Sequence, residues 1–236
     1  MLLKIDNVSK KFGGLQALRG VDLCVEEGKI AGLIGPNGSG KTTLFNLITG
    51  FHKPDTGSIH FQNEEITQLS AHQICAKGIA RTFQIAKPFE DLSVFKTVTI
   101  GALLRSKTVR QAEEKGEKLL YDLRLEDKRE KLGRSLTVVE RKRLELARAL
   151  ASEPRLLLLD EVIAGLNPIE VDEISEILRG LVKLGITILM IEHVMRAIVS
   201  LTERVTVLNT GAKIAEGDPK DLLQDPVVIE AYIGRE

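Results

Sequence analysis

The strongest constraint on the fold is a glycine-rich run that directly follows the short apolar segment 30–34. The run consists of Gly35, Pro36, Asn37, Gly38, Ser39, Gly40, Lys41, Thr42 and Thr43. The spacing G-x-x-x-x-G-K-[ST] lets glycine backbone wrap closely around an anion and points N–H groups and a helix N-terminus at it. The pattern predicts a strand, a phosphate-binding loop and a helix over residues 42–49. Lys41 would reach the β- and γ-phosphates of a nucleotide, and the Thr42 hydroxyl would bind Mg²⁺.

Composition limits the size, charge and location of the molecule. A chain of 236 residues is long enough for one substantial core and too short for two large independent domains. Lysine plus arginine equals aspartate plus glutamate at 33 each, so we expect no nucleic-acid partner. The sequence shows neither an N-terminal targeting signal nor an apolar run long enough to span a membrane. We therefore expect a cytoplasmic chain that reaches the membrane through a partner.

The N-terminal region and the middle of the chain differ in character. Residues 2–8, followed by the alternating Val21, Leu23 and Val25, predict two antiparallel strands. Residues 107–134 are dense in charge and poor in β-branched runs, which predicts solvated helices in a separate lobe.

A second α/β region follows that lobe. Residues 141–150 have helical apolar spacing, and the apolar segments 156–159 and 187–191 predict buried strands. Asn167 and Pro168 suit the start of a helix over 168–183, because Asn can cap and Pro fits the first helical position. Alternating strands and helices predict an α/β fold with a mostly parallel, covered sheet.

Polar residues at the ends of predicted strands are the candidates for chemistry. Asp160 and Glu161 follow four leucines, which places two carboxylates at the carboxyl edge of the sheet, where α/β folds bind ligands. We expect Asp160 to hold Mg²⁺ and Glu161 to polarise the attacking water. His193 follows the strand 187–191 and is a candidate γ-phosphate contact. Gln84 ends another short strand and is a candidate contact for Mg²⁺ or the attacking water.

Other histidines and cysteines form no motif. His52, His60 and His72 share no metal-ligand spacing, and we expect structural roles for them. Cys24 and Cys75 lack a second pair that could complete a metal site, so we expect buried, reduced thiols.

Together these residues resemble the nucleotide-binding subunits of ABC transporters, over essentially the whole chain. The ordered features are Phe12, the run from Gly35 to Thr43, Gln84, a signature segment, Asp160 with Glu161, the run Ala164-Gly165-Leu166-Asn167, and His193. Further segments look like the subgroup that energises importers of branched-chain and other hydrophobic amino acids: Phe12-Gly13-Gly14, Arg81-Thr82-Phe83-Gln84, Gly165-Leu166-Asn167-Pro168, Ile191-Glu192-His193 and Ala231-Tyr232-Ile233-Gly234.

The resemblance implies a P-loop NTPase (RecA-like) α/β fold, with a mostly parallel sheet, an N-terminal antiparallel β subdomain and an inserted α-helical subdomain. Residues 1–236 would form one ABC ATPase domain. Its ATP-binding core would comprise 1–84 and 151–236, and its helical signature subdomain 85–150. Two such subunits close over two ATP molecules, each held between one chain's phosphate loop and the other chain's signature. The aromatic ring of Phe12 would stack on adenine.

The signature segment departs from the family pattern. The family has Leu-Ser-Gly-Gly-Gln, whereas this chain has Leu136, Thr137, Val138, Val139 and Glu140. Thr137 keeps a hydroxyl that could meet a γ-phosphate, but two valines replace residues that allow close backbone approach. In addition, Val162 replaces the usual proline after the glutamate, and Asn167 replaces an aspartate common elsewhere in the superfamily, a change that suits the amino-acid importer subgroup.

These features suggest an asymmetric ATPase pair. If the partner is a different ATPase with a Gly-Gly signature, the site that uses Lys41 and Glu161 of this chain would be the competent one. The resemblance implies ATP and Mg²⁺ as cofactors. It also implies a homo- or heterodimer, transmembrane permease subunits at the cytoplasmic face of the membrane and, indirectly, a substrate-binding protein. The expected permease contact lies around Lys87, Pro88, Phe89 and Leu92, with packing inside the lobe as the alternative.

Several other functions stay open at this stage. An ATPase of a urea-type importer or of a lipopolysaccharide exporter would carry the same catalytic motifs. A regulator of this ATPase family acting on DNA or ribosomes usually has tandem domains or coiled-coil insertions, and this sequence shows neither. No Asn-Lys-x-Asp motif supports a GTPase. A subunit that binds ATP without hydrolysing it fits the two valines but not the presence of Glu161 and His193.

Overall fold

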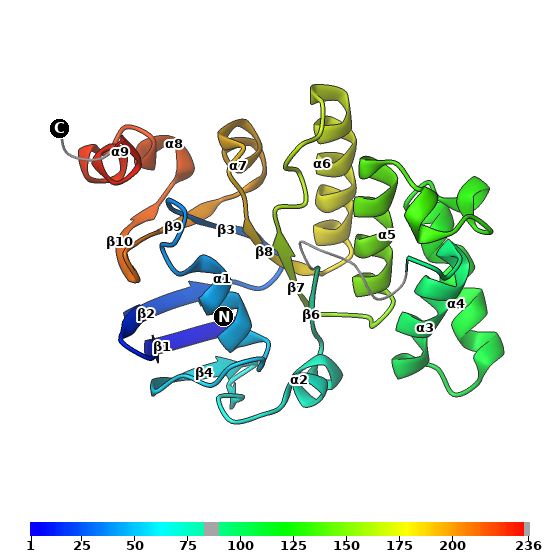
Figure 1. Cartoon of the computed structure of the whole chain (residues 1–236), viewed down its shortest axis with the longest axis horizontal. Helices are drawn as coiled ribbons and strands as arrows, with labels where there is room; N and C mark the ends of the chain where they lie inside the picture. The colour runs from blue at the N-terminus through cyan, green and yellow to red at the C-terminus, as the bar shows by residue number, and fades with distance from the viewer. Residues whose placement is uncertain (83–89, 234–236) are drawn as a thin grey trace.

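The protein, described by a computed structural model over residues 1–82 and 90–233, contains two β-sheets and a set of helices (Figure 1). Within these residues, the smaller sheet has four strands in the order β2-β1-β4-β5. Their bounds are β1 Leu3–Phe12, β2 Leu15–Val25, β4 Thr56–Phe61 and β5 Glu64–Glu65. All three pairings are antiparallel. The sheet confirms the antiparallel N-terminal subdomain predicted from the sequence.

The larger sheet carries the predicted parallel strands. In the described part of the chain its order is β10-β9-β3-β8-β7-β6, and every pairing is parallel except that of β10 with β9. The bounds are β3 Ile30–Ile34, β6 Ile79–Arg81, β7 Leu156–Asp160, β8 Thr187–Ile191, β9 Arg204–Asn209 and β10 Ala212–Gly217. The sequence analysis did not identify β9 and β10, which extend the sheet beyond β3.

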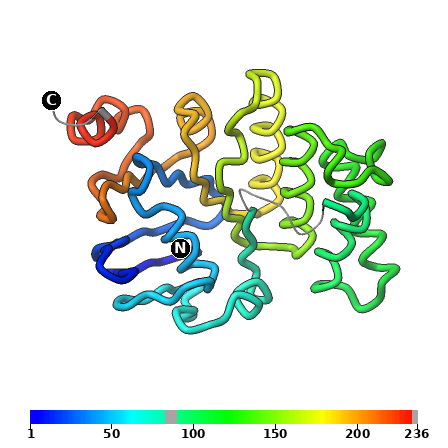
Figure 2. Tube along the Cα trace, in the orientation of Figure 1, coloured from blue at the N-terminus to red at the C-terminus, as the bar shows by residue number. Residues whose placement is uncertain are grey.

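Helices cover the large sheet and form a layer at one end of the molecule. They are α1 (Lys41–Ile48), α2 (Ala71–Lys77), α3 (Val94–Ala102), α4 (Val109–Asp122), α5 (Val138–Leu150), α6 (Pro168–Lys183), α7 (Met195–Leu201), α8 (Pro219–Leu222) and α9 (Pro226–Ile233). Figure 2 shows the chain entering the layer of α3, α4 and α5 after β6 and returning to the sheet at β7. The C-terminal helices α8 and α9 lie at the opposite end of the long axis.

The buried strands divide the apolar core into two clusters. Along β7, Leu157 and Leu159 contribute to a cluster that runs from the sheet into the helices α3 to α6, while Leu156 and Leu158 point into a second cluster. The second cluster joins the two sheets and encloses Phe45 of α1, which is fully buried. Side chains that alternate in a strand with two covered faces explain this division. The helix after the phosphate loop is therefore fixed between the two sheets.

Helix starts follow the capping signals of the sequence. Asn167 accepts hydrogen bonds from the N–H groups of Ile169 and Glu170 at 3.0 Å, and Pro168 occupies the first helical position of α6. Helix α1 begins at Lys41 and ends at Ile48, one residue earlier at each end than predicted. Helix α5 begins at Val138, three residues earlier than predicted, because Thr137 caps it.

Some of the predicted residues lie outside the part of the chain that the structure describes, and two cysteines differ from their predicted burial. Gln84 and the segment Lys87, Pro88 and Phe89 lie outside the described residues. Cys24 and Cys75 are half-buried rather than buried. Among residues 1–82 and 90–233, no helix combines the length and the apolar character that a membrane crossing needs.

Candidate functional site

The loop from Gly35 to Thr43 connects β3 to α1 and is fixed by backbone contacts from neighbouring strands. Gly35 has φ of +147°, and a Cβ atom there would overlap the carbonyl oxygen of Leu208. Gly40 has φ of +105°, and a Cβ atom there would lie 2.8 Å from the carbonyl oxygen of Ala17. Both positions need glycine for backbone freedom and for space. The loop conformation is therefore dictated by the strands around it.

Lys41 is the first residue of α1, and its side chain reaches back to the start of this loop. Its Nζ donates hydrogen bonds to the carbonyl oxygens of Gly35 at 2.8 Å and Pro36 at 2.9 Å, and only 6% of the residue is exposed. Burial lowers the pKa of the ammonium group, because the charged form loses hydration. An anion such as a phosphate would favour the charged form again. The loop thus holds a partly desolvated cation where the sequence predicts the β- and γ-phosphates.

Glu161 and His193 meet in front of the loop. His193 Nε2 lies 2.7 Å from Glu161 Oε1. The two residues follow the adjacent strands β7 and β8, and the N–H of Glu161 donates to the carbonyl of Ile191 at 2.9 Å. Glu161 has φ of +53°, a left-handed conformation that is uncommon for a side chain of this size. An ionised carboxylate only accepts hydrogen bonds, so the imidazole donates from Nε2.

Asp160 is buried beside an arginine that the sequence analysis did not place in the site. Arg81 donates from Nη2 to Asp160 Oδ2 at 2.7 Å and from Nη1 to Asn46 Oδ1 at 2.6 Å. Its guanidinium carbon lies 5.4 Å from the centre of the Phe45 ring. The signal for this contact was a charged residue at the end of β6, which pairs with β7 through Arg81 and Leu158. One oxygen of the Asp160 carboxylate is therefore held in place by an arginine that also contacts α1.

The residues around the loop fit Mg²⁺ bound together with phosphate. Mg²⁺ prefers oxygen ligands and is usually held by one or two carboxylates plus substrate phosphates. The Thr42 hydroxyl and the Asp160 carboxylate supply oxygen donors of that kind. No group of three or more His, Cys, Asp or Glu side chains that could hold a metal occurs among the residues described. A metal here would depend on the phosphate oxygens to complete its coordination.

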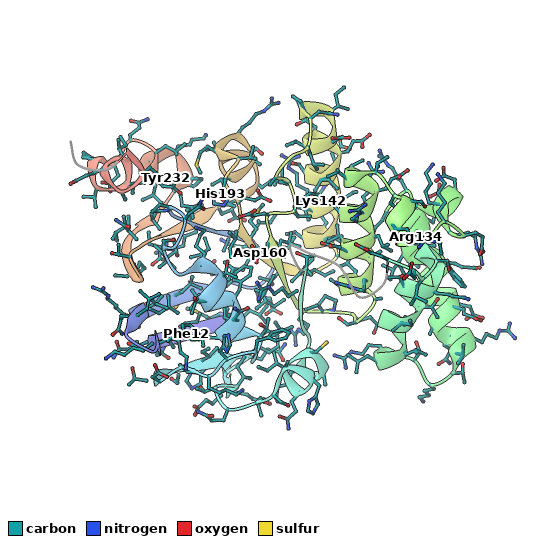
Figure 3. All side chains as sticks on the ribbon, viewed as in Figure 1. Phe12, Arg134, Lys142, Asp160, His193 and Tyr232 are labelled. Atoms are coloured by element: carbon teal, nitrogen blue, oxygen red, sulfur yellow. The ribbon has the colours of Figure 1, made fainter. Side chains whose placement is uncertain are left out.

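An open pocket of about 470 Å³ joins the phosphate loop to Glu161 and His193. Its volume lies within the range of small-molecule sites. Phe12 lines one wall, is 41% exposed, and packs edge-on against the ring of His52 at 5.1 Å between centroids. Figure 3 labels Asp160 and His193 in the middle of the molecule, between the sheet that carries Phe12 and the helix that carries Lys142.

The predicted signature residues form the N-terminus of α5, away from this pocket. Thr137 Oγ1 accepts from the N–H of Glu140 at 3.3 Å, and the Glu140 carboxylate accepts from the N–H of Thr137 at 2.9 Å. This capping box lowers the pKa of Glu140 through the hydrogen bond from the Thr137 backbone. Val138 and Val139 form the first helical positions, and Val138 is 58% exposed. The Thr137 side chain also hydrogen-bonds the Glu140 carboxylate, so both side chains are bound at the start of their own helix.

Two further charged residues contact the site and were missed by the sequence analysis. Lys142 Nζ donates to the carbonyl oxygen of Glu161 at 2.6 Å. Glu192 is fully buried, and its Oε1 accepts from the N–H of Ile163 at 2.7 Å. Burial raises the pKa of Glu192 to about 7. The signal for Glu192 was its place directly before His193, but no sequence pattern points from Lys142 to Glu161.

Comparison with known protein families gives two matches. The sequence model of the family described as "ABC transporter" matches residues 18–164. The model described as "Branched-chain amino acid ATP-binding cassette transporter" matches residues 212–236. Together they span the phosphate loop, α5, β7 and the C-terminal helices.

Individual relatives are similar over their full length. The high-affinity branched-chain amino acid transport ATP-binding protein BraF of Pseudomonas aeruginosa is 35% identical, covering 99% of this chain and 98% of the relative. The lipopolysaccharide export system ATP-binding protein LptB of Escherichia coli is also 35% identical, with 99% and 98% covered. A crystal structure of a nucleotide-free ATP-binding cassette from an ABC transporter has a TM-score of 0.91, at 35% identity and 99% coverage of both chains.

Proposed function

Because this chain belongs to the family of ABC transporter ATP-binding subunits, we propose that it powers an importer of branched-chain or other hydrophobic amino acids by hydrolysing ATP. The observation that supports this most is the Glu161–His193 contact beside the phosphate loop, within one pocket. The match of residues 212–236 to the branched-chain amino acid family supports the choice of substrate class.

The proposed reaction is attack of water on the γ-phosphorus of ATP. A water oxygen forms the new bond to phosphorus, the bond from phosphorus to the bridging oxygen breaks, and ADP and phosphate leave. Glu161 accepts a hydrogen bond from the attacking water, and His193 keeps its carboxylate oriented while facing the γ-phosphate. Lys41 and the loop N–H groups stabilise the charge on the phosphate oxygens.

A bound Mg²⁺ would supply positive charge to offset the charge that develops on the phosphate oxygens. Thr42 and Asp160 are the residues that would hold it, and Gln84, which lies outside the described residues, would complete this set. Arg81 fixes the Asp160 carboxylate from the protein side. We propose the Phe12 ring as the surface for adenine, because it is exposed at one wall of the pocket.

We propose a second ATPase subunit as the direct partner. The N-terminus of α5 would face the ATP held by that partner, and the Thr137 hydroxyl would donate to its γ-phosphate. Val138 and Val139 leave less room than two glycines for the partner's ATP to approach the α5 backbone. The two ATP sites of the pair would therefore differ in activity when the partner carries a Gly-Gly signature. The helical segment 85–150, and the region around Leu92 in particular, would contact permease subunits at the cytoplasmic face of the membrane, with a substrate-binding protein acting further away.

A transport assay tests this function. Cells that lack the gene should lose uptake of labelled leucine, and the parent chain should restore it while the Glu161→Gln variant should not. Purified transporter containing this chain should hydrolyse ATP at a rate that depends on Glu161. Normal leucine uptake without the gene would contradict the substrate class, and hydrolysis that survives Glu161→Gln would contradict the catalytic assignment.

The similarity to LptB supports a second candidate, the ATPase of a lipopolysaccharide exporter. The two candidates differ in the membrane partner. Purification of the tagged full chain from its own membranes would decide between them, because amino-acid permeases should accompany it in one case and lipopolysaccharide-transport permeases in the other.

A further inference from the structure

The backbone of Glu161 is held in an unfavourable conformation by contacts from two other segments. Its φ of +53° belongs to the left-handed region, which is uncommon and unfavourable for a residue other than glycine. The N–H donates to the carbonyl of Ile191 at the end of β8. The carbonyl oxygen of Glu161 accepts the 2.6 Å hydrogen bond from Lys142 Nζ. Removing either contact would let the peptide relax and would turn the carboxylate.

Lys142 belongs to α5, the helix whose N-terminus carries the signature segment. It lies four residues after Val138, so both residues lie on the same face of α5, one turn apart. The start of α5 is fixed by the Thr137–Glu140 capping box, and Arg143, the next residue, is paired with Glu173 of α6. The half-buried Lys142 side chain is thus carried by a rigid element, and its amino group moves when α5 moves.

The electrostatic surroundings favour this placement of the ammonium group. Glu161 and the fully buried Glu192 lie on the two segments next to it, and the Lys142 charge acts to lower the pKa of Glu192 against the larger effect of burial. Glu192 in turn holds the N–H of Ile163, two residues after Glu161. A charged donor to a backbone carbonyl is stronger than a neutral one, so the Lys142 contact is a substantial restraint on the Glu161 peptide.

We propose that Lys142 is a positioning residue that transmits the position of the signature helix α5 to the backbone of Glu161. Contact of the α5 N-terminus with a nucleotide on the partner subunit would then adjust the catalytic carboxylate of this chain's own site. The effect on catalysis rests on the proposed ATP hydrolysis. The mechanical link between α5 and the Glu161 backbone can be measured without turnover.

The first test is amide hydrogen exchange in the full chain, free of nucleotide. Lys142→Met keeps the length of the side chain and removes the donor, and it should speed exchange at the Glu161 amide by about tenfold. Lys142→Arg should keep the slow exchange of the parent. Lys118→Met, at an exposed lysine of α4, is the matched control and should change nothing there. Exchange at Glu161 that is equal in Lys142→Met and the parent would overturn the proposal.

A second substitution tests the link to the start of the helix. Thr137→Ala removes the cap of α5 and should speed exchange at Glu161 in the parent, but by less in the Lys142→Met background. Equal increases in both backgrounds would overturn the transmission through Lys142. Thermal unfolding of each variant shows whether the fold is kept.

Turnover gives the functional readout. In the assembled transporter, Lys142→Met should lower kcat about tenfold with KM for ATP within about twofold of the parent, and Lys142→Arg should restore kcat. Full kcat in Lys142→Met, or a loss that Lys142→Arg shares, would overturn the proposal. A parent transporter without turnover would instead contradict the proposed function, and the exchange measurement would still decide the role of Lys142.

Discussion

His193 Nε2 lies 2.7 Å from Glu161 Oε1, although 32 positions separate the two residues in the sequence. The contact forms because β7 and β8 are parallel neighbours, and Asp160 pairs with Ile191 at their carboxyl ends. Glu161 and His193 are 23% and 36% exposed at their side chains, so both remain open to the pocket. The imidazole thus orients the Glu161 carboxylate at the edge of the pocket.

Replacing this carboxylate should stop hydrolysis without stopping binding. We expect Glu161→Gln to lower the rate of ATP hydrolysis by about 10²–10⁴-fold, because the amide is a poor acceptor for a proton from water. ATP affinity, measured by titration calorimetry, should change little, since the phosphate loop is intact. Retained hydrolysis would assign the catalytic base to another residue.

Breaking the buried Arg81–Asp160 ion pair should lower the free energy of unfolding far more than breaking an exposed pair. Arg81 and Asp160 are 6% and 4% exposed at their side chains, so Arg81→Met would leave a buried carboxylate without its guanidinium partner. We expect a loss of about 3–5 kcal/mol in the free energy of unfolding, measured in urea. Arg110→Met, which removes the exposed pair with Glu114, should cost less than about 1 kcal/mol. Comparable losses in the two variants would refute this difference.

Glu192 should make the stability depend on pH. Its pKa of about 7 in the folded chain exceeds the ordinary value of 4.5, so the stabilisation tied to its protonated form is complete below pH 4.5 and is lost as pH rises through 7. Glu192→Gln cannot ionise. The free energy of unfolding of the variant minus that of the parent should therefore rise by about 3 kcal/mol between pH 4.5 and pH 8.

Urea unfolding of both chains at several pH values would check the prediction for Glu192. Glu176→Gln, at an exposed position of α6, controls for the loss of one carboxylate. A difference between Glu192→Gln and the parent that stays constant with pH would show that the buried carboxyl does not titrate in this range.

The phosphate loop should not tolerate a methyl group at its first glycine. Gly35→Ala would place a Cβ atom against the carbonyl of Leu208 at φ of +147°, and we expect a loss on the order of 3 kcal/mol or more. Gly180→Ala is the contrasting change, because a Cβ atom there would meet no atom within 4 Å beyond the neighbouring backbone of α6 itself. It should raise the free energy of unfolding by about 0.5–1 kcal/mol. Thermal unfolding that ranks the two variants in the opposite order would contradict the geometry.

The features that the sequence predicted are those written in local patterns. The loop at 35–43 follows from backbone chemistry, and the places of Glu161 and His193 at the carboxyl ends of two strands follow from the apolar segments 156–159 and 187–191. Residues 137–140 also contained a capping box in Thr137 and Glu140, which is a local signal for a helix start at Val138 that the analysis overlooked.

The remaining contacts of the site depend on packing between distant segments. Arg81 meets Asp160 only because β6 pairs with β7, and Lys142 reaches the Glu161 carbonyl only because α5 lies beside the end of β7. No periodicity or spacing in the sequence points to either of these two contacts. The strands β9 and β10 were missed for a related reason, since β9 is placed by its pairing with β3 and β10 by its pairing with β9.

The order of the strands has a consequence during synthesis on the ribosome. Strand β3, which leads into the phosphate loop, pairs with β8 through Ile30 and Ile188. Because β8 is synthesised much later than β3, this pairing cannot form until most of the chain has been made. A nascent chain that ends before His193 can display the loop but cannot close the pocket around it. Truncated products of translation would therefore present an incomplete nucleotide site with an unpaired strand edge, which is the kind of surface that chaperones and proteases recognise.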